Sequence, residues 1–104
     1  MVTFVNKLNV HGDLTRFLAA KSRVTRFVSA QPGCVSHQTL RLVGTANVFV
    51  ELSVWEDAAA HRAAVTSTGF RELAQDLSVL ATREQGLYET LPEQGPATAA
   101  RPAA

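Results

Sequence analysis

The stretch FVELSVWED, residues Phe49–Asp57, decides the fold because its side chains alternate in character from one residue to the next. Alternation of this kind predicts a β-strand, whose successive side chains point to opposite faces of a sheet. One row is apolar and contains Val48, Val50, Leu52 and Val54. The other row contains Phe49, Glu51, Ser53 and Trp55. A carboxylate, a hydroxyl and an indole in one row favour a surface that is part core and part pocket.

The segment before this strand predicts a strand followed by a helix. Val2–Val10 alternates, and Asp13 is a good N-cap for the helix that follows. Apolar residues of that helix fall on one stripe: Leu14, Phe17, Leu18, Val24, Phe27 and Val28. Its basic residues, which we expect to be mostly solvated, are Arg16, Lys21, Arg23 and Arg26. The sequence QPG at residues 31–33 ends the helix, because proline cannot continue the hydrogen-bond ladder.

The remaining elements complete the unit. Residues 34–43 predict a second strand, which the short turn GTAN connects to the strand over 48–55 as an antiparallel hairpin. Asp57 caps a short helix, AAAHRAAV, and a further helix begins near Thr68. The sequence EQGLYETL, residues 84–91, predicts the last strand.

This order of elements predicts an α+β fold, the ferredoxin-like split β-α-β unit, over residues 1–91. Residues 92–104 are rich in Pro, Ala and Gly and predict a disordered tail. The helices are too few to cover both faces of the sheet. The alternation of side chains does not by itself say which row of the strand faces the helices. We expect the valine row to face a twin subunit and Glu51 to face the helices. A two-fold homodimer with packed sheets is the simplest solution.

Bulk composition excludes several classes of function. The chain has 104 residues, 46% of them hydrophobic, and its net charge of +1 is scattered, which argues against nucleic-acid binding. No apolar run approaches the roughly 20 residues of a membrane span, and the N-terminus does not read as a signal peptide. A single cysteine, Cys34, excludes an internal disulfide framework and fits the reducing cytoplasm.

Three polar or aromatic residues are candidates for a site. Asn6 interrupts an apolar row, so its amide is either satisfied within the core or used to orient a ligand. Trp55 is either a core aromatic or a stacking wall whose indole N–H donates to a ligand. Glu51 either pairs with an arginine such as Arg41 or serves as a general base with a pKa raised by burial.

Histidines provide the other candidates, because imidazole titrates near neutral pH. His37 lies on the second strand and His61 on the short helix after Trp55. Each is either a satisfied or surface histidine or a proton carrier. The three histidines and Cys34 lack metal-ligand spacing, and no phosphate loop, dinucleotide fingerprint or hydrolase motif is present. We therefore expect no metal.

Four segments together resemble the antibiotic biosynthesis monooxygenase family: MVTFVNKLNV, SAQPGCVSHQTLR, NVFVELSVWEDAAAHRAAV and GFRELAQDLSVLATREQGLYETL. The resemblance covers nearly the whole chain except the tail. It implies a dimeric α+β barrel with a small-molecule pocket between sheet and helices in each subunit. It also implies cofactor-independent oxygenation of phenolic polycyclic intermediates of aromatic polyketides, in which a substrate carbanion reduces oxygen directly.

The resemblance carries over to single positions. Trp55 matches the strand-end tryptophan of these oxygenases, whereas Glu51 stands where they have an asparagine and His61 where some have a tyrosine. Asn6 matches an asparagine of a haem-degrading branch of the superfamily. The tryptophan and histidine of that branch are replaced by Ala64 and Ala74, so the resemblance argues against haem turnover by that route.

The favoured hypothesis is a homodimeric, cofactor-independent monooxygenase that acts on a flat aromatic intermediate of secondary metabolism, with molecular oxygen as co-substrate. Its proposed catalytic residues are Asn6, Glu51, Trp55, His61 and His37. Two alternatives share the scaffold: a non-catalytic small-molecule-binding accessory protein and a polyketide cyclase.

Overall fold

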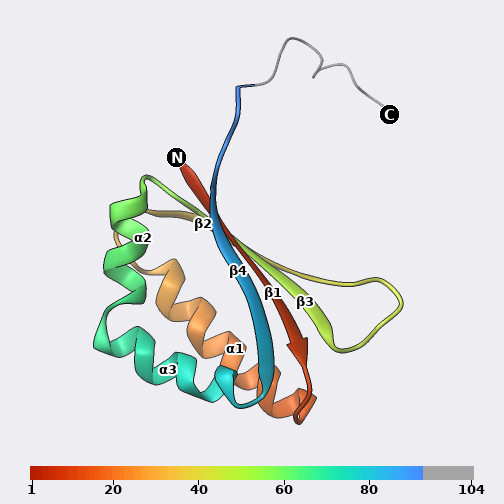
Figure 1. Cartoon of the computed structure of the whole chain (residues 1–104). Coiled ribbons are helices and arrows are strands. Elements are labelled where there is room, and N and C mark those ends of the chain that lie inside the picture. The colour runs from red at the N-terminus through yellow and green to blue at the C-terminus, as the bar shows by residue number, and fades with distance from the viewer. Residues whose placement is uncertain (93–104) are drawn as a thin grey trace.

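The computed structural model describes residues 1–92, which form one four-stranded antiparallel sheet and three helices (Figure 1). The strand order is β2-β3-β1-β4, which confirms the predicted α+β, ferredoxin-like class. The elements are β1 (Val2–Val10), α1 (Leu14–Ser29), β2 (Cys34–Arg41), β3 (Val48–Trp55), α2 (Ala58–Val65), α3 (Thr68–Ser78) and β4 (Ala81–Glu89). The predicted tail beyond residue 92 lies outside the described residues.

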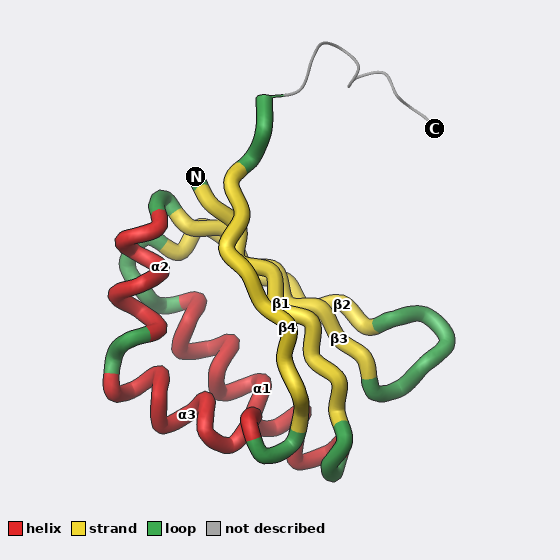
Figure 2. Tube along the Cα trace, viewed as in Figure 1, coloured by secondary structure: helices red, strands yellow, loops and turns green. Residues whose placement is uncertain are grey.

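All three helices lie on one face of the sheet (Figure 2). Side-chain caps fix where they begin: Asp13 accepts a hydrogen bond from the backbone N–H of Arg16 at 2.9 Å, and Asp57 from that of Ala60 at 2.8 Å. Both predicted N-caps are thus confirmed. None of the helices in residues 1–92 is long and apolar enough to cross a membrane.

The inner face of the sheet is set by the alternation in β3. Phe49, Glu51, Ser53 and Trp55 are all buried, whereas the valine row is partly exposed, which confirms the expected orientation. In the sheet register Glu51 lies between Thr39 of β2 and Asn6 of β1, and Gln85 of β4 lies beyond Asn6. A polar row therefore crosses the sheet beneath the helices. The apolar core flanks it, with Phe17 of α1 stacked on Phe49 at 5.2 Å between ring centroids.

The QPG turn brings β2 under α2. Gly33 has a φ of +86°, and a Cβ on this residue would lie 2.5 Å from the Cβ of Ala60. Only glycine combines this backbone conformation with so close an approach. The turn therefore ends α1 as predicted and also sets the packing of α2 on the sheet.

Three sequence-based predictions need correction. Lys21 was expected to be solvated, but it is buried, with 4% of its surface exposed, because it reaches under α1 to a carboxylate of the sheet. Leu18, assigned to the apolar stripe, is 41% exposed. The last strand begins at Ala81 rather than residue 84, because Leu80 already turns the chain back toward β1.

Candidate active site between the sheet and the helices

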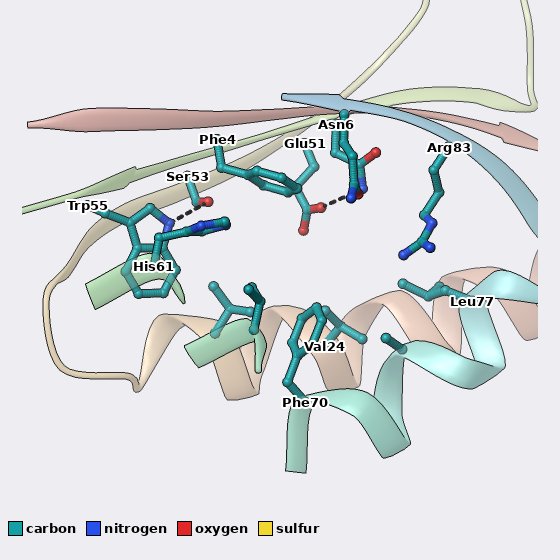
Figure 3. Close-up of a pocket in the computed structure, with 14 residues that line it drawn as sticks. Phe4, Asn6, Val24, Glu51, Ser53, Trp55, His61, Phe70, Leu77 and Arg83 are labelled. Carbon is teal, nitrogen blue, oxygen red and sulfur yellow. Dashed lines mark hydrogen bonds between the residues drawn. The ribbon is translucent and has the colours of Figure 1, made fainter. Parts of the chain in front are cut away.

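A cavity of about 200 Å³ lies between the inner face of the sheet and the three helices (Figure 3). It is somewhat smaller than the ~300–1,000 Å³ usual for small-molecule sites. Strand residues form its polar side and helix residues its mostly apolar side. The lining consists of Phe4, Asn6, Val24, Val28, Glu51, Ser53, Trp55, His61, Val65, Phe70, Ala74, Leu77, Arg83 and Gln85.

Four of the five predicted site residues line this one cavity: Asn6, Glu51, Trp55 and His61. They come from β1, β3 and α2, so the fold brings together groups as far as 55 residues apart in sequence. The fifth, His37, is not part of the lining and contacts Glu51 from β2. The cavity therefore gathers most of the predicted residues, and His37 can act only through Glu51.

One end of the cavity is aromatic. Trp55 is only 1% exposed, and its indole N–H donates to the hydroxyl of Ser53 at 2.9 Å. The His61 ring lies edge-on to Trp55 at 5.4 Å and tilted against Phe4 at 4.8 Å between centroids. Trp55 lines the cavity as one of its walls, and its single N–H is engaged by Ser53, so a stacking role for the indole stays a prediction.

The middle of the cavity holds a buried carboxylate with several polar partners. Oε2 of Glu51 lies 3.0 Å from Nζ of Lys21 and 2.9 Å from Nε2 of His37. Its other oxygen, Oε1, accepts a hydrogen bond of 3.3 Å from the amide of Asn6. Lys21 in turn donates to the hydroxyls of Thr25 and Thr39 at 2.8 and 3.1 Å. Buried charges are tolerated when they are paired and hydrogen-bonded in this way.

These partners determine the pKa of Glu51. Burial by itself raises that pKa, but the hydrogen bond from His37 and the charge of Lys21 outweigh it and lower the pKa from 4.5 to about 2. The predicted raised pKa is therefore wrong, and so is the predicted pairing with Arg41, whose guanidinium lies over the Phe49 ring at 5.2 Å. Ionisation of Glu51 favours the folded state by about 3 kcal/mol above pH 4.5, and this contribution is lost as pH falls toward 2.

Two polar atoms of the cavity lining are buried and lack a hydrogen-bond partner within residues 1–92: Oδ1 of Asn6 and Nε2 of His61. Desolvation lowers the pKa of His61 below its usual 6.5, and the nearby charge of Arg62 lowers it further, against an opposing effect of Glu51. His61 is therefore neutral at pH 7. Buried polar groups are normally paired with protein or with water, so both atoms are available to hydrogen-bond with whatever occupies the cavity.

Several lining residues were missed by sequence reasoning. Arg83 lay outside the predicted last strand, so its inward direction was not seen. Gln85 and Phe4 carried no signal beyond their place in an alternating strand. Within residues 1–92 no group of three His, Cys, Asp or Glu side chains is placed to hold a metal ion. The absence of a metal stays a prediction.

We predict that Lys21 and Glu51 are strongly coupled in stability. Lys21→Met leaves the buried Glu51 without its cation, and Glu51→Gln leaves the buried Lys21 without its carboxylate, so each should lower the free energy of unfolding by about 3–5 kcal/mol. The double variant leaves neither charge and should cost well under the sum of the two. Urea denaturation of all four proteins measures this coupling.

The matched control is the exposed pair Arg23–Asp76, whose side-chain atoms lie 3.3 Å apart. The double-mutant cycle of Arg23→Met and Asp76→Asn should give a coupling free energy below about 1 kcal/mol. If the losses at Lys21 and Glu51 simply add, the two side chains do not form the buried pair described above.

Comparison with known proteins agrees with this architecture. A model of the antibiotic biosynthesis monooxygenase family matches residues 1–76. Deoxynogalonate monooxygenase of Streptomyces nogalater is 41% identical over 100 residues, covering 93% of this chain and 85% of that protein. The crystal structure of SnoaB, a cofactor-independent oxygenase of the same organism, is 37% identical with a TM-score of 0.84. That match covers 91% of this chain and 97% of SnoaB.

More distant structures share the fold alone. One from Nitrosomonas europaea is 15% identical, with a TM-score of 0.79 over 88% of this chain and 100% of its own. The resemblance seen in the sequence is therefore confirmed, and the chain belongs to the antibiotic biosynthesis monooxygenase family.

Proposed function

We propose that the protein is a cofactor-independent monooxygenase that oxidises a flat, phenolic, aromatic polyketide-type intermediate of secondary metabolism. The observation that carries this proposal is the cavity, with its aromatic end and its two unpartnered polar atoms, in a chain of this family. The similarity to SnoaB, described as a cofactor-independent oxygenase, supports a reaction that needs no flavin, haem or metal. A cytoplasmic location agrees with the single free thiol, Cys34.

The reaction is the conversion of an activated methylene, as in an anthrone, to a quinone carbonyl. A base removes a proton, and the resulting delocalised carbanion transfers electrons to oxygen and forms a peroxide at that carbon. Loss of the second proton from carbon then breaks the O–O bond. One oxygen atom remains as the carbonyl and the other leaves as water. The protein must hold the anion, accept a proton and keep bulk water away.

His61 is the best-placed proton acceptor. Its Nε2 lies in the cavity without a partner, its ring is held between Phe4 and Trp55, and its lowered pKa keeps it neutral at pH 7. A neutral imidazole in reach of the ligand is what general base catalysis requires. Trp55 supplies the wall on which a flat ring packs.

Asn6 is proposed to orient the substrate, with Glu51 and His37 positioning it. Glu51 fixes the Asn6 amide by accepting from its NH₂ group, which leaves Oδ1 for a hydroxyl of the ligand. A carboxylate whose pKa is about 2 is a poor base near neutral pH, so we assign Glu51 a positioning role rather than proton transfer. His37 is not part of the cavity lining and contacts Glu51 from β2.

We also propose that the valine row is covered by a second copy of the chain, giving the dimeric barrel that the family resemblance implies. The three helices lie on the other face of the sheet, so Val50, Leu52 and Val54 remain partly exposed. Leu40 and Tyr88 add exposed apolar surface, at 42% and 59%. An apolar sheet face of this kind is typical of an interface.

Oxygen uptake with a dihydroxyanthrone tests the proposed activity. Asn6→Ala removes the hydrogen bond that orients the substrate and should lower kcat/KM about tenfold. Trp55→Phe keeps the aromatic wall and loses only the bond to Ser53, so its effect should be about tenfold at most. Arg71→Gln, on the exposed side of α3, is the control. Ring closure without oxygen uptake would instead favour a cyclase, and binding without turnover an accessory protein.

The pH dependence of kcat/KM identifies the base. If His61 accepts the proton, the rate rises with pH through a pKa below 6.5 and then levels off, because only neutral imidazole is active. His61→Ala should abolish this rise of kcat/KM with pH and lower the rate about 10²-fold or more. His11→Ala, a change at an exposed histidine, should leave it intact. If the rate still rises with pH through the same pKa in His61→Ala, another group accepts the proton and the assignment to His61 is wrong.

Sedimentation of variants tests the dimer. Leu52→Lys places two like charges near each other across a two-fold interface and should give a monomer. Val79→Lys, at a residue 65% exposed beyond the end of α3, should remain dimeric. An unmodified protein that sediments as a monomer contradicts the proposal.

A further inference from the structure

Arg83 is a charged group of the cavity lining that the proposed chemistry does not use. It lies on β4 opposite Leu8 of β1, on the inner face of the sheet. In Figure 3 its guanidinium hangs below the sheet, at the end of the cavity away from Trp55 and His61. Gln85, two residues further on β4, lines the cavity beside it.

The charges around the cavity leave Arg83 uncompensated. The lining contains one carboxylate, Glu51, and Lys21 already neutralises it at 3.0 Å. Arg83 forms no ion pair within residues 1–92; the acid beside Leu77 on α3, Asp76, is held by Arg23. Glu84, its neighbour on β4, faces the other side of the sheet, opposite Lys7. Arg83 is an exposed residue, so it places a positive charge at the solvent-facing end of the cavity that no described carboxylate pairs.

We propose that Arg83 binds a carboxylate substituent of the aromatic substrate. A planar guanidinium matches a carboxylate with two parallel hydrogen bonds, and its charge is fixed at every pH at which the protein is folded. The opposite end, formed by Trp55, Phe4 and the neutral His61, carries no cationic side chain within residues 1–92 that could pair with a carboxylate. The two ends thus orient the ligand, with its carboxylate at Arg83 and its phenolic, reacting part at His61.

This inference rests on the proposed function for the aromatic nature of the ligand, but binding can be measured without turnover. The probes are a dihydroxyanthraquinone carboxylic acid and its neutral methyl ester, which are already oxidised. Binding is followed by quenching of Trp55, the single tryptophan of the chain. The variants are Arg83→Gln and Arg83→Lys, with Arg71→Gln on the exposed side of α3 as the control.

The unmodified protein should bind the acid about tenfold more tightly than the ester. Arg83→Gln should remove this preference by weakening the acid about tenfold while changing the ester by less than about twofold. Arg83→Lys keeps the positive charge but cannot donate two parallel hydrogen bonds to the carboxylate, so it should retain part of the preference for the acid. Arg71→Gln should behave as the unmodified protein.

Equal binding of acid and ester by the unmodified protein overturns the inference, and so does an equal loss for both probes in Arg83→Gln. Oxygen uptake with a neutral dihydroxyanthrone keeps the two proposals apart. Uptake without any preference for the acid overturns the role of Arg83 and leaves the oxygenase standing. A preference for the acid without uptake supports Arg83 and counts against the oxygenase.

Discussion

The buried contact between Lys21 and Glu51 is the constraint on which the rest of the site depends. A carboxylate that is 6% exposed cannot remain ionised without a partner, and the lysine that supplies it is 4% exposed on a different layer. Because the 3.0 Å contact joins α1 to β3, it fixes the distance between helix and sheet at the level of the cavity. Thr25 and Thr39 hold the ammonium group from both layers, so the position of the cation is determined as well.

From this contact follows the division of chemical roles. With Oε2 of Glu51 held by a lysine and a histidine and Oε1 by Asn6, the carboxylate has a strongly lowered pKa and little capacity to accept a proton. Proton transfer is then left to His61, which is neutral for the opposite reason: it is desolvated and has no carboxylate in contact. The two groups lie in one cavity, and the surroundings of each lower its pKa. The lowered pKa keeps Glu51 ionised, whereas it keeps His61 neutral.

The alternation of residues 48–55 was enough to predict the strand and its two rows, and the polar groups in one row indicated which of them faces a pocket under the helices. The same pattern placed Asn6, and the caps at Asp13 and Asp57 located two helix starts. The partner of Glu51 could not be predicted in this way, because helical periodicity assigns a lysine to the solvated side and says nothing of a carboxylate on another layer. Arg83 was missed because the predicted last strand began at residue 84: the start of β4 is polar, so no alternating apolar row marks where the strand begins.

The departure of Glu51 from the family resemblance, which implies an asparagine there, is explained by the same network. An amide at this position would need no cation, whereas a carboxylate needs Lys21 and gains His37. The acid, the lysine and the histidine therefore act as one unit whose net effect on the cavity is close to that of a neutral polar group. What the unit adds is rigidity: Asn6 receives a charged acceptor, which binds its amide more strongly than a neutral one and so fixes where its free oxygen points. The electrostatic character of the cavity is then left to Arg83, the cation in its lining that no described carboxylate offsets.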